Sequence, residues 1–226
     1  MYAAEAEGLR ALRAAGVRAP EPFRHGLRDG KAFIEMERLA LGARPDWAAM
    51  GRMLAALHRT TSARFGWQRD NWIGLAPQKN GFSDDWIGFY RDCRLVPQLE
   101  RAGLLKDAQS LLQNLDSFFE NHRPRPSLLH GDLWNGNAGF TAEGPVIFDP
   151  AVYYGDREAD IAMTELFGGF PEEFHASYDE AFPLSKGYAV RKNLYNLYHL
   201  LNHLNLFGGG YLGQVKATLR LLAGGF

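Results

Sequence analysis

The feature that most constrains this sequence is an eleven-residue run in its second half, SLLHGDLWNGN, from Ser127 to Asn137. A short apolar segment leads into His130-Gly131-Asp132, and a glycine-punctuated turn brings Asn137 five residues after Asp132. A second apolar segment then ends at Asp149, twelve residues further on. Singly, such residues are ordinary turn formers. The complete order of apolar run, carboxylate, amide and second carboxylate is far more specific.

This order suits phosphoryl transfer on a kinase-type scaffold. There, one Asp accepts the proton of the acceptor hydroxyl, while an Asn five residues later and an Asp at the end of a nearby strand hold Mg²⁺. Mg²⁺ prefers octahedral oxygen ligands and keeps several waters, so one amide and one carboxylate on opposed backbone segments suffice. The motif therefore predicts a phosphotransferase.

Composition bounds the class of protein. With 226 residues, the chain can bury a sizeable core as one large domain or two small lobes. A net charge of −1 and scattered Lys and Arg give no reason to expect a nucleic-acid or membrane partner. The single Cys93 excludes an intramolecular disulfide and a cysteine-based zinc site, and we expect it to be a packing residue. Without a long apolar run or a signal region, we expect a cytoplasmic location.

Hydrophobic periodicity and turn residues predict the elements. Helices are expected over residues 2–15, 46–60, 84–102, 105–121, 157–167, 172–181, 186–203 and 210–223. Residues 23–26 and 32–37 are expected to pair around Asp29-Gly30, with Lys31 as a solvated charge at that turn. Asp46 is a predicted N-cap, and residues 65–81 read as a long loop. The order indicates a short mixed α/β start, a catalytic hairpin region and a large helical remainder.

With this order of elements, the sequence resembles the fructosamine/ketosamine-3-kinase family, a branch of the protein-kinase-like and aminoglycoside-phosphotransferase-like fold. The similar stretches run over essentially the whole chain: EAEGL (5–9), FGW (65–67), DNWIG (70–74), PQKN (77–80), HGDLWNGN (130–137), FDPA (148–151), YYGDREADIAM (153–163), LFGGF (166–170) and LYHLLNHLNLFG (197–208). The aminoglycoside and choline kinases share only the sparser His-Gly-Asp…Asn…Asp skeleton.

The resemblance implies an α+β, protein-kinase-like fold with an incomplete N-terminal lobe and a large, mainly helical C-terminal lobe. Residues 1–40 would be a remnant of the nucleotide-binding lobe and hinge, and residues 41–226 would form the catalytic lobe.

The resemblance also implies roles for the motif residues. Asp132 would be the catalytic base that orients the C3 hydroxyl of a ketosamine on a glycated amine or protein. Asn137 and Asp149 would be the Mg²⁺ ligands. Trp134 would pack against the sugar or its amine-borne group, or alternatively in the core beneath the loop.

On the nucleotide side, the resemblance implies that a strand ending at Met36 leads into the hinge. The carbonyl of Glu37 and the amide of Leu39 would contact the adenine of ATP. Glu5 would be the helix carboxylate that pairs with a phosphate-contacting Lys, with Glu7 as the alternative.

Four other polar residues lie in the matching stretches. Asp156 and Asp160 are expected to brace the activation-segment region through backbone hydrogen bonds rather than to touch substrate. His199 and His203, four residues apart on a predicted helix, could form half of a metal site. No third ligand is apparent, so packing histidines are the favoured interpretation.

The sequence also departs from the family. Family members carry a Gly-rich hairpin over the phosphates and a Lys-bearing strand before this helix, and neither precedes Glu5 here. Lys31 lies after the helix and cannot substitute. Phosphoryl transfer depends on positioning and charge stabilisation. We therefore expect this form to be weakly active or inactive, with a catalytic rate lower by on the order of 10³-fold. An unpaired sheet edge near residues 22–37 should also invite a second chain, giving a homodimer.

Three functional interpretations stay open. The first is an ATP- and Mg²⁺-dependent ketosamine-3-kinase. The second is a related small-molecule kinase acting on an aminoglycoside, choline or another sugar. The third is a non-catalytic, pseudokinase-like module. Retention of Asp132, Asn137 and Asp149 together speaks against the third, because a protein freed from catalysis has no chemical need for all three.

Overall fold

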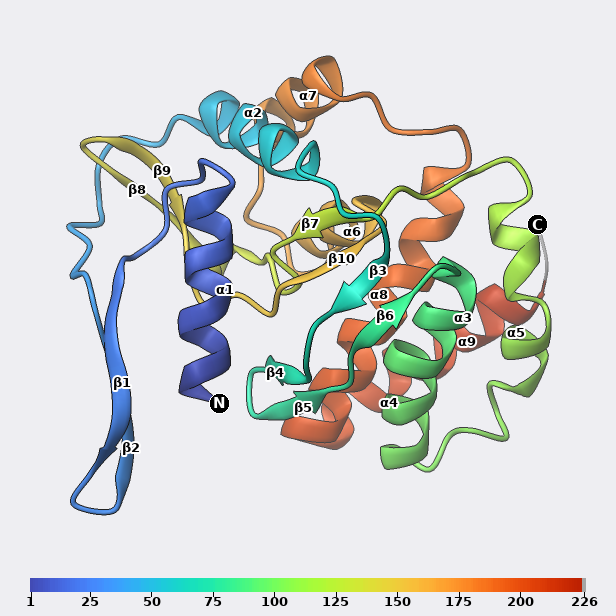
Figure 1. Ribbon diagram of the computed structural model, residues 1–226. Helices are drawn as coiled ribbons and strands as arrows, with labels where there is room; N and C mark the ends of the chain where they lie inside the picture. Colours follow the sequence, from blue (N-terminus) through green and yellow to red (C-terminus); the bar gives the residue numbers. More distant parts are fainter. Residues whose placement is uncertain (225–226) are drawn as a thin grey trace.

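A computed structural model describes residues 1–224 (Figure 1). Its helices are α1 (Tyr2–Ala14), α2 (Trp47–His58), α3 (Trp86–Tyr90), α4 (Val96–Arg101), α5 (Gln109–Gln113), α6 (Glu158–Leu166), α7 (Glu172–Ala181), α8 (Tyr188–Phe207) and α9 (Leu212–Ala223). Its strands are β1 (Pro22–Arg28), β2 (Lys31–Met36), β3 (Phe65–Trp67), β4 (Asn71–Ile73), β5 (Ala76–Gln78), β6 (Gly81–Ser83), β7 (Ser127–Leu129), β8 (Ala138–Thr141), β9 (Gly144–Ile147) and β10 (Tyr153–Gly155).

A small antiparallel sheet in the order β6-β3-β10-β7 lies at the centre of the molecule. Strand β7 pairs with β10 in the register Tyr153 opposite Leu129, so the residues that follow β7 start from a buried strand end. The separate hairpin β8–β9 comes next in the chain, between Asn137 and Asp149. The sheet and this hairpin therefore set the backbone of the whole motif.

The helices pack around these strands. Helix α8 runs through the helical part of the molecule, in contact with α6 and α9, while α2 packs on α7 (Figure 1). The α2–α7 contact is close because α2 carries Gly51, where a Cβ would lie only 2.5 Å from the carbonyl oxygen of Phe174. This part of the chain is held by one continuous hydrophobic core.

The hairpin β1–β2 is a two-stranded sheet of its own that extends beside α1 (Figure 1). Most of its side chains are exposed, including Phe23 at 61% and Leu27 at 76%. After it, the amides of Gly42 and Ala43 donate to the carbonyl oxygen of Phe140, at 3.1 and 3.2 Å. The connecting segment is thereby fastened to β8.

Most predicted elements are confirmed. The hairpin turns at Asp29-Gly30, both in positive φ, with Lys31 exposed beside them. Asp46 caps α2 by accepting from the amide of Ala49 at 2.8 Å. Cys93 packs against the core.

Three expectations about the elements were wrong. The predicted loop 65–81 contains strands β3, β4 and β5 and leads directly into β6, and β10 was not predicted at all. These strands have three residues each, too few to show an alternation of polar and apolar positions. The predicted helix 105–121 is reduced to α5 and a 3₁₀ turn. There, Asn114 donates from its side chain to the Ser110 carbonyl and accepts from Ser117 at its own carbonyl, bonds that compete with a regular helix.

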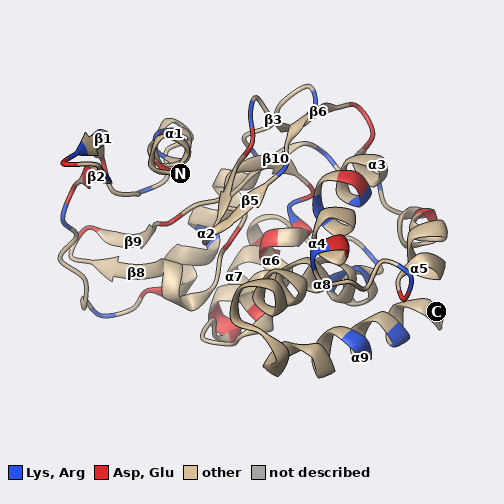
Figure 2. Ribbon diagram, turned by 90° about the horizontal axis from the view of Figure 1, so that it is seen from below, with Lys and Arg blue, Asp and Glu red and all other residues tan. Residues whose placement is uncertain are grey.

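In Figure 2, Lys and Arg are dispersed along the described chain among Asp and Glu, with basic residues on α9 and acidic residues on α7. No helix in residues 1–224 is long and apolar enough to cross a bilayer.

Candidate active site

The loop that carries Asp132 leaves β7 through a turn that requires glycine. Gly131 has φ +84°, and a Cβ at this position would lie 2.1 Å from the carbonyl oxygen of Ala151. A side chain would therefore force the loop away from the segment before β10. The amide of Ala151 in turn donates to the carbonyl oxygen of His130 at 2.8 Å.

Asp160, on α6, anchors this loop from beneath. Its carboxylate accepts from the backbone amides of His130 and Gly131, at 2.7 and 2.9 Å. His58 Nε2 lies 3.1 Å from the same carboxylate. Burial opposes ionisation, but the hydrogen bond and charge of His58 and the Gly131 amide outweigh it and hold the pKa of Asp160 below its usual value. Asp160 does brace the backbone, as expected, but at the loop that carries Asp132 and not at the activation-segment region.

Asp132 has a different environment. Its side chain is 16% exposed, and its carboxylate makes no hydrogen bond within the described residues. Burial, followed by the negative charges of Asp149 and Asp160, raises its pKa to about 7. A side chain that can release or take up a proton near neutrality suits a general base.

Asn137 and Asp149 present oxygen atoms beside Asp132. The Asn137 amide nitrogen donates to the backbone carbonyl oxygens of Asp132 and Asp149, at 2.9 and 3.4 Å. This orientation leaves Asn137 Oδ1 without a hydrogen-bond partner among residues 1–224. Asp149 is exposed and has φ +57°, an uncommon conformation for a residue other than glycine. The amide and carboxylate oxygens are the donor types that Mg²⁺ prefers, so the residues fit this ion.

Glu5 and Asp149 line a cavity of about 230 Å³, together with Tyr2, Trp72 and Leu75. Burial and the nearby Asp149 charge raise the pKa of Glu5, whose carboxylate has no hydrogen bond or ion pair in residues 1–224. Glu7, the alternative candidate, is already engaged: it accepts from Trp67 Nε1 at 2.8 Å and from Gln68, and it pairs with Arg69. Glu5 is therefore the carboxylate that faces the site.

The residues expected at the hinge lie apart from this cavity. Met36 ends β2, and the Glu37 amide donates to the Glu21 carbonyl at 2.8 Å. The Glu37 carboxylate accepts from Arg18 at 2.7 and 2.5 Å, and this pairing lowers the pKa of Glu37 to about 2. In the described part of the chain, the Glu37 carbonyl and the Leu39 amide have no hydrogen-bond partner.

Trp134 immediately precedes the short 3₁₀ segment Asn135–Asn137. It is 39% exposed, so the alternative of core packing beneath the loop was wrong. Its ring covers Gly136, where a Cβ would lie 2.3 Å from the indole. A half-exposed indole two residues from Asp132 is available to a ligand.

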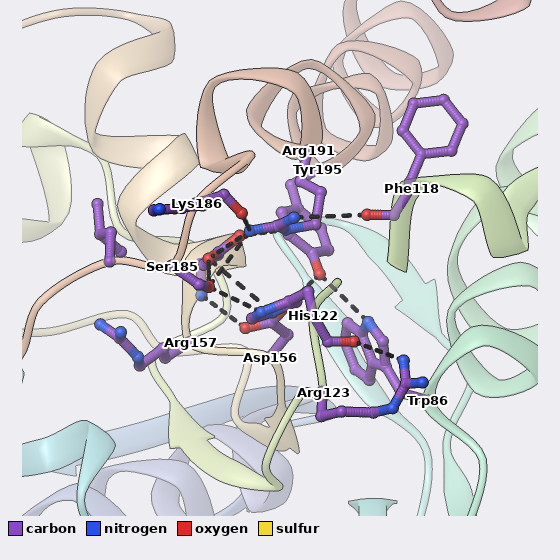
Figure 3. Close-up of polar contacts among 12 residues, drawn as sticks. Trp86, Phe118, His122, Arg123, Asp156, Arg157, Ser185, Lys186, Arg191 and Tyr195 are labelled. Atoms are coloured by element: carbon purple, nitrogen blue, oxygen red, sulfur yellow. Dashed lines mark hydrogen bonds and ion pairs between the residues drawn. The ribbon is translucent and has the colours of Figure 1, made fainter. Parts of the chain in front are cut away.

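A second polar cluster follows β10, around Asp156 and Glu158, and sequence reasoning missed most of it (Figure 3). Asp156 accepts from Tyr195 at 2.5 Å and lies 2.7 Å from His122 Nε2. Glu158 accepts from Arg191 at 2.7 and 3.0 Å. Asp156 makes one backbone bond, from the Glu158 amide at 3.1 Å, so bracing through backbone bonds is only a small part of what it does.

The ligand atoms of His122, Asp156 and Glu158 lie within 4.8 Å of one another, which is close enough for a metal ion. However, their polar atoms are already bonded. His122 Nδ1 lies 2.7 Å from the Ser185 hydroxyl, and that hydroxyl donates to Glu158 at 2.6 Å. With the Arg191 cation paired to Glu158, the cluster is a satisfied structural network.

Among residues 1–224, His199 and His203 are not part of a metal-competent group of three, and His203 is a packing residue on α8. His203 Nδ1 lies 2.9 Å from the His199 carbonyl oxygen, and its ring contacts Phe167 and Tyr211 at centroid distances of 4.6 and 5.2 Å. In residues 1–224, the metal-competent group of three is the His122 cluster.

The fold and this site define the class of the protein as a phosphotransferase with a protein-kinase-like, α+β fold. A thermostable variant of the aminoglycoside phosphotransferase APH(4)-Ia shares this fold, with a TM-score of 0.59 at 13% identity over 97% of this chain and 81% of that one. The family model for fructosamine kinase matches residues 1–223. The chain belongs to the fructosamine kinase family.

Individual relatives agree with this assignment. A probable ketoamine kinase of Synechocystis is 47% identical over 97% of this chain and 78% of its own length. A chloroplastic protein-ribulosamine 3-kinase of Arabidopsis thaliana is 43% identical over 97% of this chain and 71% of its own. The crystal structure of a protein named as a "putative fructosamine-3-kinase" from Haemophilus somnus superposes with a TM-score of 0.90 at 29% identity, covering 98% of this chain and 79% of that one.

Proposed function

We propose that this chain catalyses the ATP- and Mg²⁺-dependent phosphorylation of the C3 hydroxyl of ketosamines on glycated amines or proteins. The observation that carries the proposal is the grouping of Asp132, Asn137 and Asp149, whose side-chain oxygens have no hydrogen-bonding partner in the described chain. The names of the ketoamine and ribulosamine 3-kinase relatives support the substrate class.

In the proposed reaction, Asp132 orients the C3 hydroxyl and accepts its proton. The hydroxyl oxygen forms a bond to the γ-phosphorus of ATP as the bond from that phosphorus to the leaving ADP oxygen breaks. Asn137 Oδ1 and the Asp149 carboxylate would hold Mg²⁺, which when bound neutralises charge on the phosphates. Asp160 keeps the backbone of His130 and Gly131 in place while this occurs.

The proposed nucleotide side is built from residues 1–40, with residues 41–226 as the catalytic side. The free Glu37 carbonyl and Leu39 amide would bind the adenine edge, and Met36 would contact its ring. Glu5 would pair with a phosphate-contacting cation, as its open carboxylate suggests. Trp134, half-exposed beside the base, would pack on the sugar or its amine-borne group.

A homodimer through the β1–β2 hairpin is part of the proposal. The hairpin forms a sheet of only two strands, with exposed Phe23 and Leu27, so a second chain could pair with it. Size-exclusion chromatography with light scattering should show a dimer, and a clean monomer at micromolar concentration would count against it.

The decisive test is turnover of Mg·ATP with fructose-lysine, with phosphate placed on the C3 oxygen by NMR. The assay should be run on this chain and on a version extended at its N-terminus by a Gly-rich hairpin and a Lys-bearing strand. A 3-phosphate product from either supports the proposal. If both ignore fructose-lysine but phosphorylate an aminoglycoside or choline, the substrate class is wrong. If neither phosphorylates any of these acceptors, the proposal fails.

A further inference from the structure

We propose that His199 is a positioning residue for Asp132. Its imidazole would donate Nδ1–H to Oδ1 of Asp132 when the acceptor is bound, leaving the other carboxylate oxygen for the sugar hydroxyl. This inference rests on the proposed function, because it assigns a partner to the catalytic base.

The first observation is an unpartnered buried nitrogen. His199 is 4% exposed, and its Nδ1 has no hydrogen bond in the described structure. Leaving a buried polar atom unpaired is costly, so such an atom needs a partner or a function. Helix α8 places this atom 3.8 Å from Oδ1 of Asp132. A shift of about 1 Å would close the gap to an ordinary N–H···O bond.

The second observation is what already fixes Asp132. Its loop is held by the bonds from Asp160 to the preceding two amides, and Asn137 binds its backbone carbonyl. All these bonds act on the backbone and leave the carboxylate free to rotate. His199 approaches the carboxylate itself and would supply the missing constraint.

The chemistry of the imidazole agrees with a donor role. Burial lowers the pKa of His199 to about 3, so the ring is neutral over the working pH range and carries a single N–H. When Asp132 is ionised, as it must be to act as a base, a lone pair on Nδ1 would face its negative oxygen, whereas a proton on Nδ1 is attracted by that oxygen. The geometry thus favours the Nδ1–H tautomer.

The test compares His199→Leu, which removes the donor, with His199→Asn, whose amide nitrogen can take the place of Nδ1. In whichever chain turns over, His199→Leu should lower kcat by roughly ten- to a hundredfold, as expected for the loss of a hydrogen bond to a charged group, with KM for ATP unchanged. His199→Asn should restore most of the rate. Asn196→Leu is the matched control: it lies on the same helix, also carries an unpaired buried atom, and should leave kcat unchanged.

A double-mutant cycle separates positioning from packing. If His199 acts through Asp132, His199→Leu should cause no further loss in an Asp132→Asn background. An equal loss in both backgrounds, no loss in the single variant, or no rescue by Asn would overturn the inference.

A spectroscopic readout keeps the inference testable without turnover. Long-range ¹H–¹⁵N NMR of the histidine rings should show His199 protonated at Nδ1, with a shift of that signal in Asp132→Asn. An Nε2–H tautomer would overturn the inference. If the tautomer is as expected while ketosamine turnover fails, the failure belongs to the proposed substrate and not to the His199–Asp132 pairing.

Discussion

In the polar network of α6, which we call the back, carboxylates are surrounded by hydrogen-bond donors. Around the cavity lined by Asp149 and Glu5, which we call the front, carboxylates face one another. Asp160 accepts two backbone amides and lies beside His58, and Glu158 is paired with Arg191. Asp149 and Glu5, in contrast, line one cavity without a hydrogen-bonding partner in the described chain. We infer from this comparison that the bonded carboxylates stabilise the fold, whereas the unbonded ones that the fold keeps in place would bind a cation.

The largest effect should follow from changing the front. Asp149→Asn removes the carboxylate proposed to bind the metal, and we expect the phosphorylation rate to fall by about 10³-fold. Stability should be kept or slightly raised, because asparagine tolerates the φ of +57° and no longer repels Glu5. Steady-state kinetics beside thermal unfolding would check this. If the phosphorylation rate and the thermal stability of this variant fell together, the distinction between the front and the back would be contradicted.

A substitution in the back should instead lower the stability of the fold. Arg191→Met leaves the fully buried Glu158 charge without its cation, and we expect a loss of about 3–4 kcal/mol in the free energy of unfolding. Glu158→Gln in that background should recover part of the loss, because it removes the unpaired charge. Urea unfolding of the single and double variants measures both. No loss in Arg191→Met would show that the network does not support the fold.

Asp160→Asn should give a smaller change at the junction between the two regions. Weaker bonds to the His130 and Gly131 amides should cost about 2 kcal/mol of stability and lower kcat together with it. If stability falls while kcat is unaffected, Asp160 supports the core and not the catalytic loop. Amide hydrogen exchange at Gly131 would report the loosening directly.

The pH dependence sharpens the same comparison. The folded-state pKa of Asp160 is below its unfolded value of roughly 3.9, so its contribution to stability is present above that value and is lost as the pH falls through the folded pKa. Unfolding free energies between pH 6 and 3 should therefore decline less steeply in Asp160→Asn than in the unchanged protein. Identical slopes would contradict the role given to this carboxylate.

Glu5→Gln should have the smallest effect, and it should raise stability, whereas Arg191→Met and Asp160→Asn lower it. Burial and Asp149 raise the pKa of Glu5, so its ionisation weakens the fold as the pH rises through the folded pKa. Replacing it by a neutral residue should slightly raise the melting temperature at pH 7, by no more than a few degrees. A lower melting temperature would mean that Glu5 has a stabilising partner in the folded protein.

Local signals in the sequence predicted much of the fold. The Asp46 cap, the Asp29-Gly30 turn and the long periodic helices depend on neighbouring residues, and the structure has them. The three-residue strands β3, β6 and β10 depend on pairing with distant segments instead, while β4 and β5 pair only with each other. Such short strands leave almost no pattern of their own.

The candidate site divides in the same way. Asp132, Asn137 and Asp149 are close in sequence, so their spacing alone was enough to predict them as candidate site residues. The network at the back joins Glu158 of α6 and Arg191 of α8 to His122, which precedes β7, so it forms only when distant parts of the chain pack together. His199 was noticed as one of a pair with His203, but its approach to Asp132 follows from the path of α8. The spacing of residues along the sequence does not predict the distance between His199 and Asp132.

The measurement that tests the account most directly is binding of Mn²⁺ with a non-hydrolysable ATP analogue, followed by electron paramagnetic resonance. The unchanged protein and Arg191→Met, studied at a temperature where it is folded, should bind the metal–nucleotide complex alike. Asp149→Asn and Asn137→Leu should bind the ion at least tenfold more weakly. Normal binding by both front variants, or an equal loss in folded Arg191→Met, would contradict the assignment of the unbonded oxygens as the metal site.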